Sequence, residues 1–183
     1  FLNDLDGFAK LLSACEHILP ADGMLGVAPH SLRAVTGNEL AALVDMRKGV
    51  PVHIHAAEQL KEVDASLAFL GARPVEWLLA NAEVNVNWCL IHATHVTDAE
   101  IAALAASGAV AGLCPVTEAN LGDGIFPAVR YFEAGGRIAT GTDSNILIDP
   151  AQELRALEYS QRLSHRARNL LASDAIPSVG RSL

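Results

Sequence analysis

Two histidines and a carboxylate lie close together in the stretch VPVHIHAAEQ, residues 50–59. On a β-strand, His53 and His55 would share one face of the sheet, because strand side chains alternate with period two. Glu58 follows His55 by three residues, just beyond the expected end of the strand. Imidazole nitrogens bind divalent metal ions, and a carboxylate beside them can carry protons. The stretch therefore indicates either a metal site with an acid–base group or two structural histidines in a core strand.

Polar side chains of the same kinds recur further along the chain, each at or just after the end of a short apolar run. They are His30 after residues 24–29, His92 near the end of 86–93, Glu118 and Asn120 after 109–115, and Asp143 at the end of 137–143. A hydrolytic metal site needs nitrogen and oxygen ligands, an open position for water and a proton carrier. Any one of these residues alone is more often a hydrogen-bonded structural group. The shared placement at strand ends is what makes a site plausible.

The elements that must position these residues follow from the periodicity of the sequence. We expect strands at 24–29, 50–56, 86–93, 109–115 and 137–143. We expect helices at 36–49, within 58–80 with interruptions at Gly71 and Pro74, at 97–108, near 127–134 and from Pro150 onward. Thr36 and Thr97 are each followed three residues later by glutamate, the spacing of a capping box. Residues 116–124, VTEANLGDG, favour a loop because Asn, Gly and Asp suit turns, although Glu118 and Asn120 could equally line a pocket.

The repeated alternation of strand and helix predicts βα units, a parallel sheet and hence an α/β fold. In such sheets the active site lies at the carboxyl ends of the strands, where the polar residues fall. A doubly wound sheet would carry a glycine-rich GxGxxG turn, which the sequence lacks. The pattern therefore favours a (β/α) barrel, and one domain accounts for residues 1–183.

Composition narrows the class of protein further. The chain has 183 residues and a net charge of −8, which argues against nucleic-acid or anionic-membrane partners. Its three cysteines, Cys15, Cys89 and Cys114, are far apart and form no CxxC pair, so a reducing cytoplasm fits better than a disulfide framework. No apolar run approaches the ~20 residues that span a bilayer. The expected partner is a small-molecule substrate.

Four stretches, in order, resemble strands five to eight of the amidohydrolase superfamily, in its deaminase and chlorohydrolase branch: HIHAAEQ, LIHATHVT, LCPVTEANLGDG and IATGTDSNI. A fifth, GVAPHSLRAV, is similar to the formimidoylglutamate deiminase family within it. The resemblance covers nearly the whole chain. It implies a partial TIM-type (β/α) barrel, the C-terminal part from about strand 4/5 to strand 8, with the N-terminal strands and a small flanking β-domain lying outside residues 1–183.

The resemblance also implies roles for individual residues. His55 and Asp143 would bind one divalent metal ion, with zinc as the expected ion. Glu58 would shuttle protons, His92 would face the reacting carbon, and Asp143 would also take the proton of the attacking water. The implied enzyme is a hydrolase of non-peptide C–N bonds, and the intact enzyme would be a cytoplasmic homodimer.

Substrate specificity is implied for the HSLR stretch, in which His30 and Arg33 would bind a substrate with carboxylates. The implied reaction converts N-formimino-L-glutamate to N-formyl-L-glutamate and ammonia, a step of histidine degradation. Alternatively, Arg33 is a surface residue that caps a helix or pairs with Glu39. Two other functions stay open: a superfamily deaminase or chlorohydrolase for a purine or related ring, and a catalytically silent half-barrel.

One departure from the superfamily pattern concerns the metal ligands. The superfamily has an HxH pair on its first strand, which we expect before residue 1. His53 and His55 do not fit that pair, since Glu58 follows His55 and the later strand-end residues come in the expected order. His53 is then expected to be a core-facing barrel histidine. The chain alone is expected to bind metal weakly at most, to be inactive, and to expose a sheet edge.

Overall fold

The computed structural model describes residues 3–144 and 147–183, so the last two residues of IATGTDSNI lie outside the described part. At its centre is a four-stranded sheet with strand order β1-β2-β3-β4. All neighbouring strands are parallel. The strands are β1 (Val52–Ala56), β2 (Trp88–His92), β3 (Val110–Leu113) and β4 (Arg137–Thr140). The predicted α/β class with a parallel sheet is confirmed.

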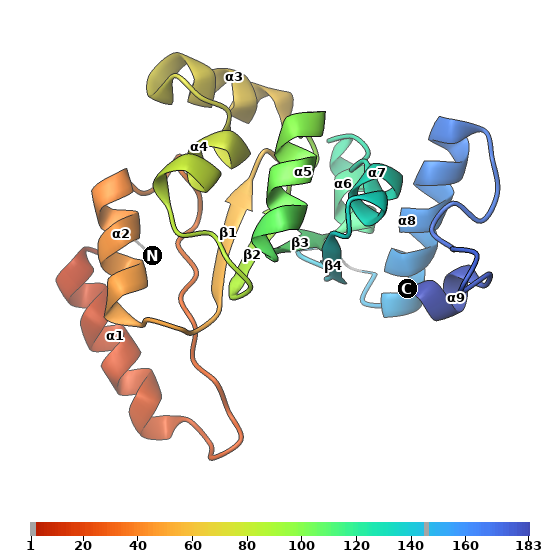
Figure 1. Cartoon of the computed structure of the whole chain (residues 1–183). Coiled ribbons are helices and arrows are strands. Elements are labelled where there is room, and N and C mark those ends of the chain that lie inside the picture. The colour runs from red at the N-terminus through yellow and green to blue at the C-terminus, as the bar shows by residue number, and fades with distance from the viewer. Residues whose placement is uncertain (1–2, 145–146) are drawn as a thin grey trace.

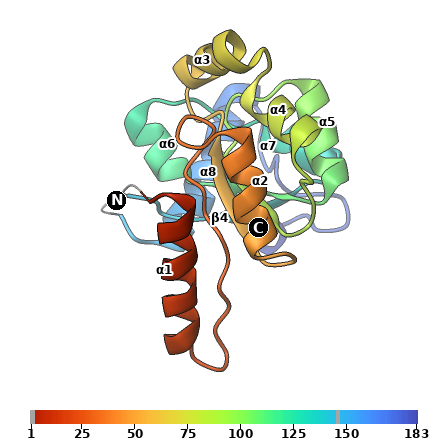
Figure 2. The ribbon, with the colours of Figure 1, turned by 90° about the vertical axis from the view of Figure 1, so that its left-hand side faces the viewer.

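Helices form the connections between successive strands (Figure 1). Those between strands are α3 (Leu60–Leu70) and α4 (Pro74–Asn81) before β2, α5 (Asp98–Ser107) before β3, and α6 (Pro115–Leu121) and α7 (Ala128–Glu133) before β4. The others are α1 (Leu5–Ile18), α2 (Gly37–Met46), α8 (Pro150–His165) and α9 (Val179–Ser182). α1 and the loop after it extend away from the rest of the molecule (Figures 1 and 2). No helix within the described ranges has both the length and the apolar character needed to cross a membrane.

Local sequence signals explain most helix boundaries. Thr36 and Thr97 each form the predicted capping box. The threonine hydroxyl accepts from the backbone N–H of the third helical residue, a glutamate, and the carboxylate of that glutamate accepts from the backbone N–H of the threonine. Gly71 and Gly108 end α3 and α5 in the left-handed conformation, at φ 72° and 76°. These signals fix where each of these helices begins or ends relative to the neighbouring strands.

The two faces of the sheet differ in burial. In β1, Val52, Ile54 and Ala56 are buried in a core cluster that also contains helix residues such as Leu78 and Leu104. His53, on the opposite face, is exposed. His53 thus lies on the face away from the helices, and its burial in the interior of a complete barrel stays a prediction. His55 shares the face of His53 but is partly buried.

The expected strand at 24–29 is reduced to two isolated parallel bridges, Val27 with Val52 and Ser31 with His55. Val27 accepts from the His53 N–H and donates to Pro51, which starts a ladder along the edge of β1. The next donor in that ladder would be residue 29, and proline has no N–H. The pairing therefore breaks, and the segment instead delivers residues 30–33 to the end of β1.

Residues 116–124 are mostly helical, so the expected loop is wrong there. Helix α6 begins at Pro115, whose fixed φ suits a first helical position, and ends at Gly122 with φ 69°. The preference of Asn, Gly and Asp for turns applies only to its last turn and the residues after it. This short helix places Glu118 directly beyond β3.

Candidate active site

Backbone strain gathers at the carboxyl ends of the strands. Ala57, His92, Ala93 and Asp143 all have positive φ, at 54°, 68°, 48° and 49°. Residues other than glycine seldom adopt this conformation, and such outliers cluster at functional sites. Ala57 follows β1, His92 and Ala93 lie at the end of β2, and Asp143 follows β4. The chain therefore turns at the positions where the predicted polar side chains lie.

His92 is the centre of the polar cluster and is only 1% exposed. Its Nε2 atom lies 3.6 Å from Glu58 Oε1 and 3.9 Å from Asp143 Oδ2. Its Nδ1 atom lies 3.2 Å from Glu118 Oε1. The structure thus brings together the three residues predicted to be catalytic, from three different strand ends.

The electrostatics of His92 are set by opposing effects. Burial alone lowers its pKa, but the hydrogen bond with Glu118 and the charges of Glu58, Glu118 and Asp143 outweigh it, so the pKa is raised. Within the described residues, the Nε2 atom of His92 is buried without a hydrogen-bond partner. A buried polar atom is normally paired. Here it faces two carboxylates at distances just beyond that of a hydrogen bond.

His55 has the environment of a metal ligand. Its Nδ1 lies 2.7 Å from the carbonyl oxygen of His30. A carbonyl only accepts, so Nδ1 carries the hydrogen and Nε2 keeps its lone pair, as in most metal-binding histidines. The His55 ring stacks on His30 at 4.8 Å between centroids and tilts against His92 at 5.7 Å.

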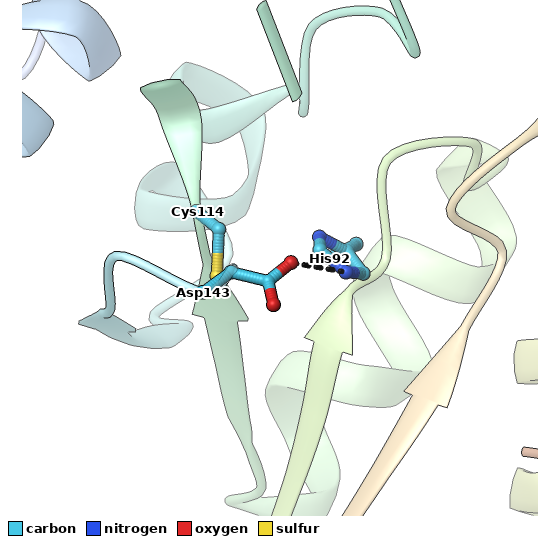
Figure 3. A group of neighbouring side chains, drawn as sticks. All are labelled: His92, Cys114 and Asp143. Atoms are coloured by element: carbon cyan, nitrogen blue, oxygen red, sulfur yellow. Dashed lines mark ion pairs between the residues drawn. The ribbon is translucent and has the colours of Figure 1, made fainter. Parts of the chain in front are cut away.

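A second arrangement of possible ligands is formed by His92, Cys114 and Asp143, whose ligand atoms lie within 4.8 Å of one another (Figure 3). His55 is not part of this group in the described residues. Burial above all, together with nearby carboxylates such as Glu118, raises the pKa of the Cys114 thiol to about 12. We keep His55 and Asp143 as the candidate metal ligands, because the bond from Nδ1 of His55 to His30 leaves Nε2 for a metal ion.

Glu118 is the functional candidate that sequence reasoning did not assign. It is buried, and its Oε1 atom accepts from the backbone N–H of Cys114 at 2.9 Å besides contacting His92. Asn120, by contrast, is exposed. The one signal for Glu118 in the sequence was its place just after a strand.

His30 stacks on His55, and Arg33 lies close enough to His30 for its charge to act on that ring. Arg33 and His30 are both exposed, and the pKa of His30 is lowered by burial first and then by the nearby charges of His55 and Arg33. Glu39 is engaged in the capping box of Thr36, and no ion pair between it and Arg33 occurs among the described residues. The pairing alternative for Arg33 therefore has no support.

The turn that carries Glu58 is anchored by a neighbouring acid. Glu62 is buried, and its two carboxylate oxygens accept from the backbone N–H groups of Ala57 and Glu58, at 3.1 and 2.9 Å. These bonds hold Ala57 in its left-handed conformation. The position of Glu58 is thus fixed through its backbone.

Comparison with curated proteins gives two informative relatives. The chain is 50% identical, over 100% of its length, to formimidoylglutamate deiminase of Pseudomonas aeruginosa. It is 35% identical, over 86% of its length, to 5-methylthioadenosine/S-adenosylhomocysteine deaminase of Halobacterium salinarum. It covers 41% and 37% of these proteins, so the chain spans about two fifths of the length of the relatives it matches.

Solved structures agree with these relatives in fold. An amidohydrolase from Brucella melitensis matches with a TM-score of 0.97 and 55% identity, over 100% of this chain and 41% of its own. An adenosine deaminase from Xanthomonas campestris with bound zinc matches with a TM-score of 0.80 and 26% identity, over 88% of this chain and 38% of its own. The sheet is thus part of a TIM-type barrel, as expected. A profile of the Amidohydrolase family matches residues 8–178, and the chain therefore belongs to that family.

Proposed function

We propose that the protein containing this chain hydrolyses the formimino group of N-formimino-L-glutamate, releasing ammonia and N-formyl-L-glutamate. The observation that carries the proposal is the stacking of His30 on His55, next to the cluster of Glu58, His92 and Asp143, with the charge of Arg33 close enough to act on the His30 ring. An exposed guanidinium near such a cluster suits a substrate that bears carboxylates. The 50% identity to a formimidoylglutamate deiminase supports the same substrate.

The residues present fit a divalent metal ion. His55 offers Nε2, since its Nδ1 is committed to His30, and Asp143 offers a carboxylate just beyond β4. Zinc accepts this pairing of imidazole and carboxylate as part of a larger ligand set. A metal ion bound there would lower the pKa of a water molecule toward ~7 and so supply the nucleophile.

The chain's own groups would then move the protons. Asp143 would take a proton from the attacking water, and Glu58 would deliver one to the imine nitrogen. His92 would donate a hydrogen bond from Nε2 to the tetrahedral adduct in its protonated form, which its raised pKa favours, while Nδ1 donates to Glu118. One C–O bond forms, the C–N bond to the departing nitrogen breaks, and that nitrogen leaves as ammonia.

The test is ammonia release from N-formimino-L-glutamate by the full-length gene product, loaded with zinc. We expect turnover that a chelator abolishes and that added zinc restores. Absence of turnover in the zinc-loaded protein would contradict the proposal.

A second candidate is deamination of a purine nucleoside, favoured by the 35% identity to a 5-methylthioadenosine/S-adenosylhomocysteine deaminase. The same preparation should therefore be assayed with 5-methylthioadenosine. We expect N-formimino-L-glutamate to be preferred, because Arg33 has no evident partner on a neutral purine. A higher kcat/KM for the nucleoside would replace the first candidate with the second.

We also propose a cytoplasmic location. Cys89 and Cys114 are buried free thiols, and Cys15 is a partly buried one, which suits a reducing compartment. Quantifying free thiols in protein isolated from its own cells under alkylating conditions tests this, with a disulfide as the contrary result.

A further inference from the structure

We infer that Glu118 is a positioning residue that holds a hydrogen on Nδ1 of His92 and so makes Nε2 the nitrogen that faces the reaction. The effect on turnover rests on the proposed function, whereas the effect on the ring itself does not. His92 is 1% exposed and Glu118 is 4% exposed, so solvent does not compete for their contact.

Hydrogen-bond chemistry determines the direction of this contact. Glu118 Oε1 accepts from the backbone N–H of Cys114 at 2.9 Å, and that group can only donate. The same oxygen lies 3.2 Å from His92 Nδ1. Because Oε1 acts as an acceptor, the hydrogen between the two side chains belongs to Nδ1 of His92. This one carboxylate therefore determines that Nδ1 points to Glu118 and that Nε2 points to the other side of the ring.

The carboxylate is held by secondary structure rather than by a long loop. Glu118 lies in helix α6, where its N–H donates to the carbonyl of Cys114 at 2.9 Å. Its own carbonyl accepts from Asp123 at 2.9 Å, which closes the turn after the helix. Both ends of the residue are therefore fixed, and the helix starts directly after β3. A rigid acceptor of this kind orients an imidazole ring.

The consequence lies at the far side of the ring. With Nδ1 bonded to Glu118, Nε2 points at Glu58 and Asp143, at 3.6 and 3.9 Å. A ring free to turn over would present carbon atoms to those carboxylates in part of the population. Loss of the Glu118 acceptor should thus weaken catalysis while leaving substrate binding at Arg33 intact.

The test uses the full-length gene product, with zinc, and compares Glu118→Ala, Glu118→Gln and Glu118→Asp. Glutamine keeps an acceptor oxygen at the same reach, aspartate withdraws it by one carbon, and alanine removes it. Glu100→Gln is the control, because Glu100 is an equally buried acid that pairs with Arg73 instead. Readouts are kcat, KM, zinc content and nitrogen NMR of the His92 ring, identified by its loss in His92→Gln.

We expect the wild-type ring to carry a hydrogen on Nδ1. In Glu118→Ala we expect kcat to fall about 10–100-fold, the range found for outer partners of site histidines. KM should stay within about twofold and the ring should populate both tautomers. Glu118→Gln should restore kcat to within about threefold, and Glu118→Asp should fall between the two. The control should keep kcat and the ring signature.

A wild-type ring without a hydrogen on Nδ1 would overturn the inference, and so would an unchanged kcat in Glu118→Ala or an equal loss in the alanine and glutamine variants. If alanine prevents folding, an aspartate variant with wild-type kcat and ring spectrum would overturn it as well. Failure of the proposed function is distinct: the wild type would then release no ammonia, while the NMR comparison would still support the placement of the hydrogen.

Discussion

The rings of His30 and His55 stack at 4.8 Å between centroids, and the carbonyl of His30 accepts from Nδ1 of His55. One segment of backbone therefore both orients the candidate metal ligand and carries the candidate substrate-binding residues. Because residues 30–33 pair with the end of β1 through Ser31, the two functions are mechanically linked. A change that displaces this segment should affect metal and substrate binding together, whereas side-chain changes within it should separate them.

Arg33→Ala should raise the KM for N-formimino-L-glutamate about 10–100-fold with little change in kcat. The lost charged hydrogen bonds to a carboxylate are worth roughly 1.5–3 kcal/mol. Steady-state kinetics measure this, with an N-alkylformamidine that lacks carboxylates as the control substrate, for which variant and wild type should be alike. An unchanged KM for the acidic substrate would remove Arg33 from the binding site.

His55→Asn should weaken zinc binding by more than about 100-fold, since loss of even an outer partner of a metal ligand costs about 10–100-fold. Zinc content after dialysis against a calibrated chelator measures the effect. The matched control is His53→Asn, because His53 lies on the same face two residues earlier and is exposed. Equal zinc loss in both variants would mean that His55 has no special part in metal binding.

Glu58→Gln should lower kcat about 10²–10⁴-fold, the usual contribution of a positioned acid–base group. Zinc content and thermal stability should be preserved, because the turn is anchored by Glu62 through backbone N–H groups. Glu133→Gln, an exposed change on α7, serves as the control. A variant that keeps kcat within about threefold of the wild type would show that the proton carrier is another residue.

Cys89 should resist alkylation at pH 8, because burial raises the pKa of its thiol to about 11. Only the thiolate reacts, so its labelling rate should rise about tenfold per pH unit until about pH 11. The folded state favours the neutral thiol, and its stabilising contribution is lost as the pH rises toward 11. Peptide mapping after iodoacetamide treatment tests this against the more accessible Cys15; equally fast labelling at pH 8 would contradict it.

Fold class and most elements were predictable because capping and termination signals are local. Thr97, Glu100 and Gly108 define α5 from within a dozen residues. The strand expected at 24–29 does not form as a continuous strand, because Pro29 lacks the N–H that the hydrogen-bond ladder needs, although the hydrophobicity of the segment favours a strand. Helix α6 was missed because its turn-forming residues stand at its end, while its start depends on Pro115.

The site was predictable as a set of residue types at strand ends, and far less so as a set of contacts. Glu118 and His92 are separated by 26 positions, and nothing local indicates that they meet. For His53, period two gives the face of the strand but not what covers that face in a complete barrel. The catalytic and binding roles of the predicted residues stay predictions.

The positive φ of His92 has a consequence for how this site could change over evolution or in design. His92 is in register with Ala56, on the helix-packed face, yet its ring tilts against His55 of the other face. The direction of the His92 side chain is therefore set by its left-handed backbone conformation and not by the alternation of side chains along the strand. Trp88 and Leu90, which share its parity, belong to the helix-facing layer. That layer could be repacked for stability without changing the direction in which the His92 ring points.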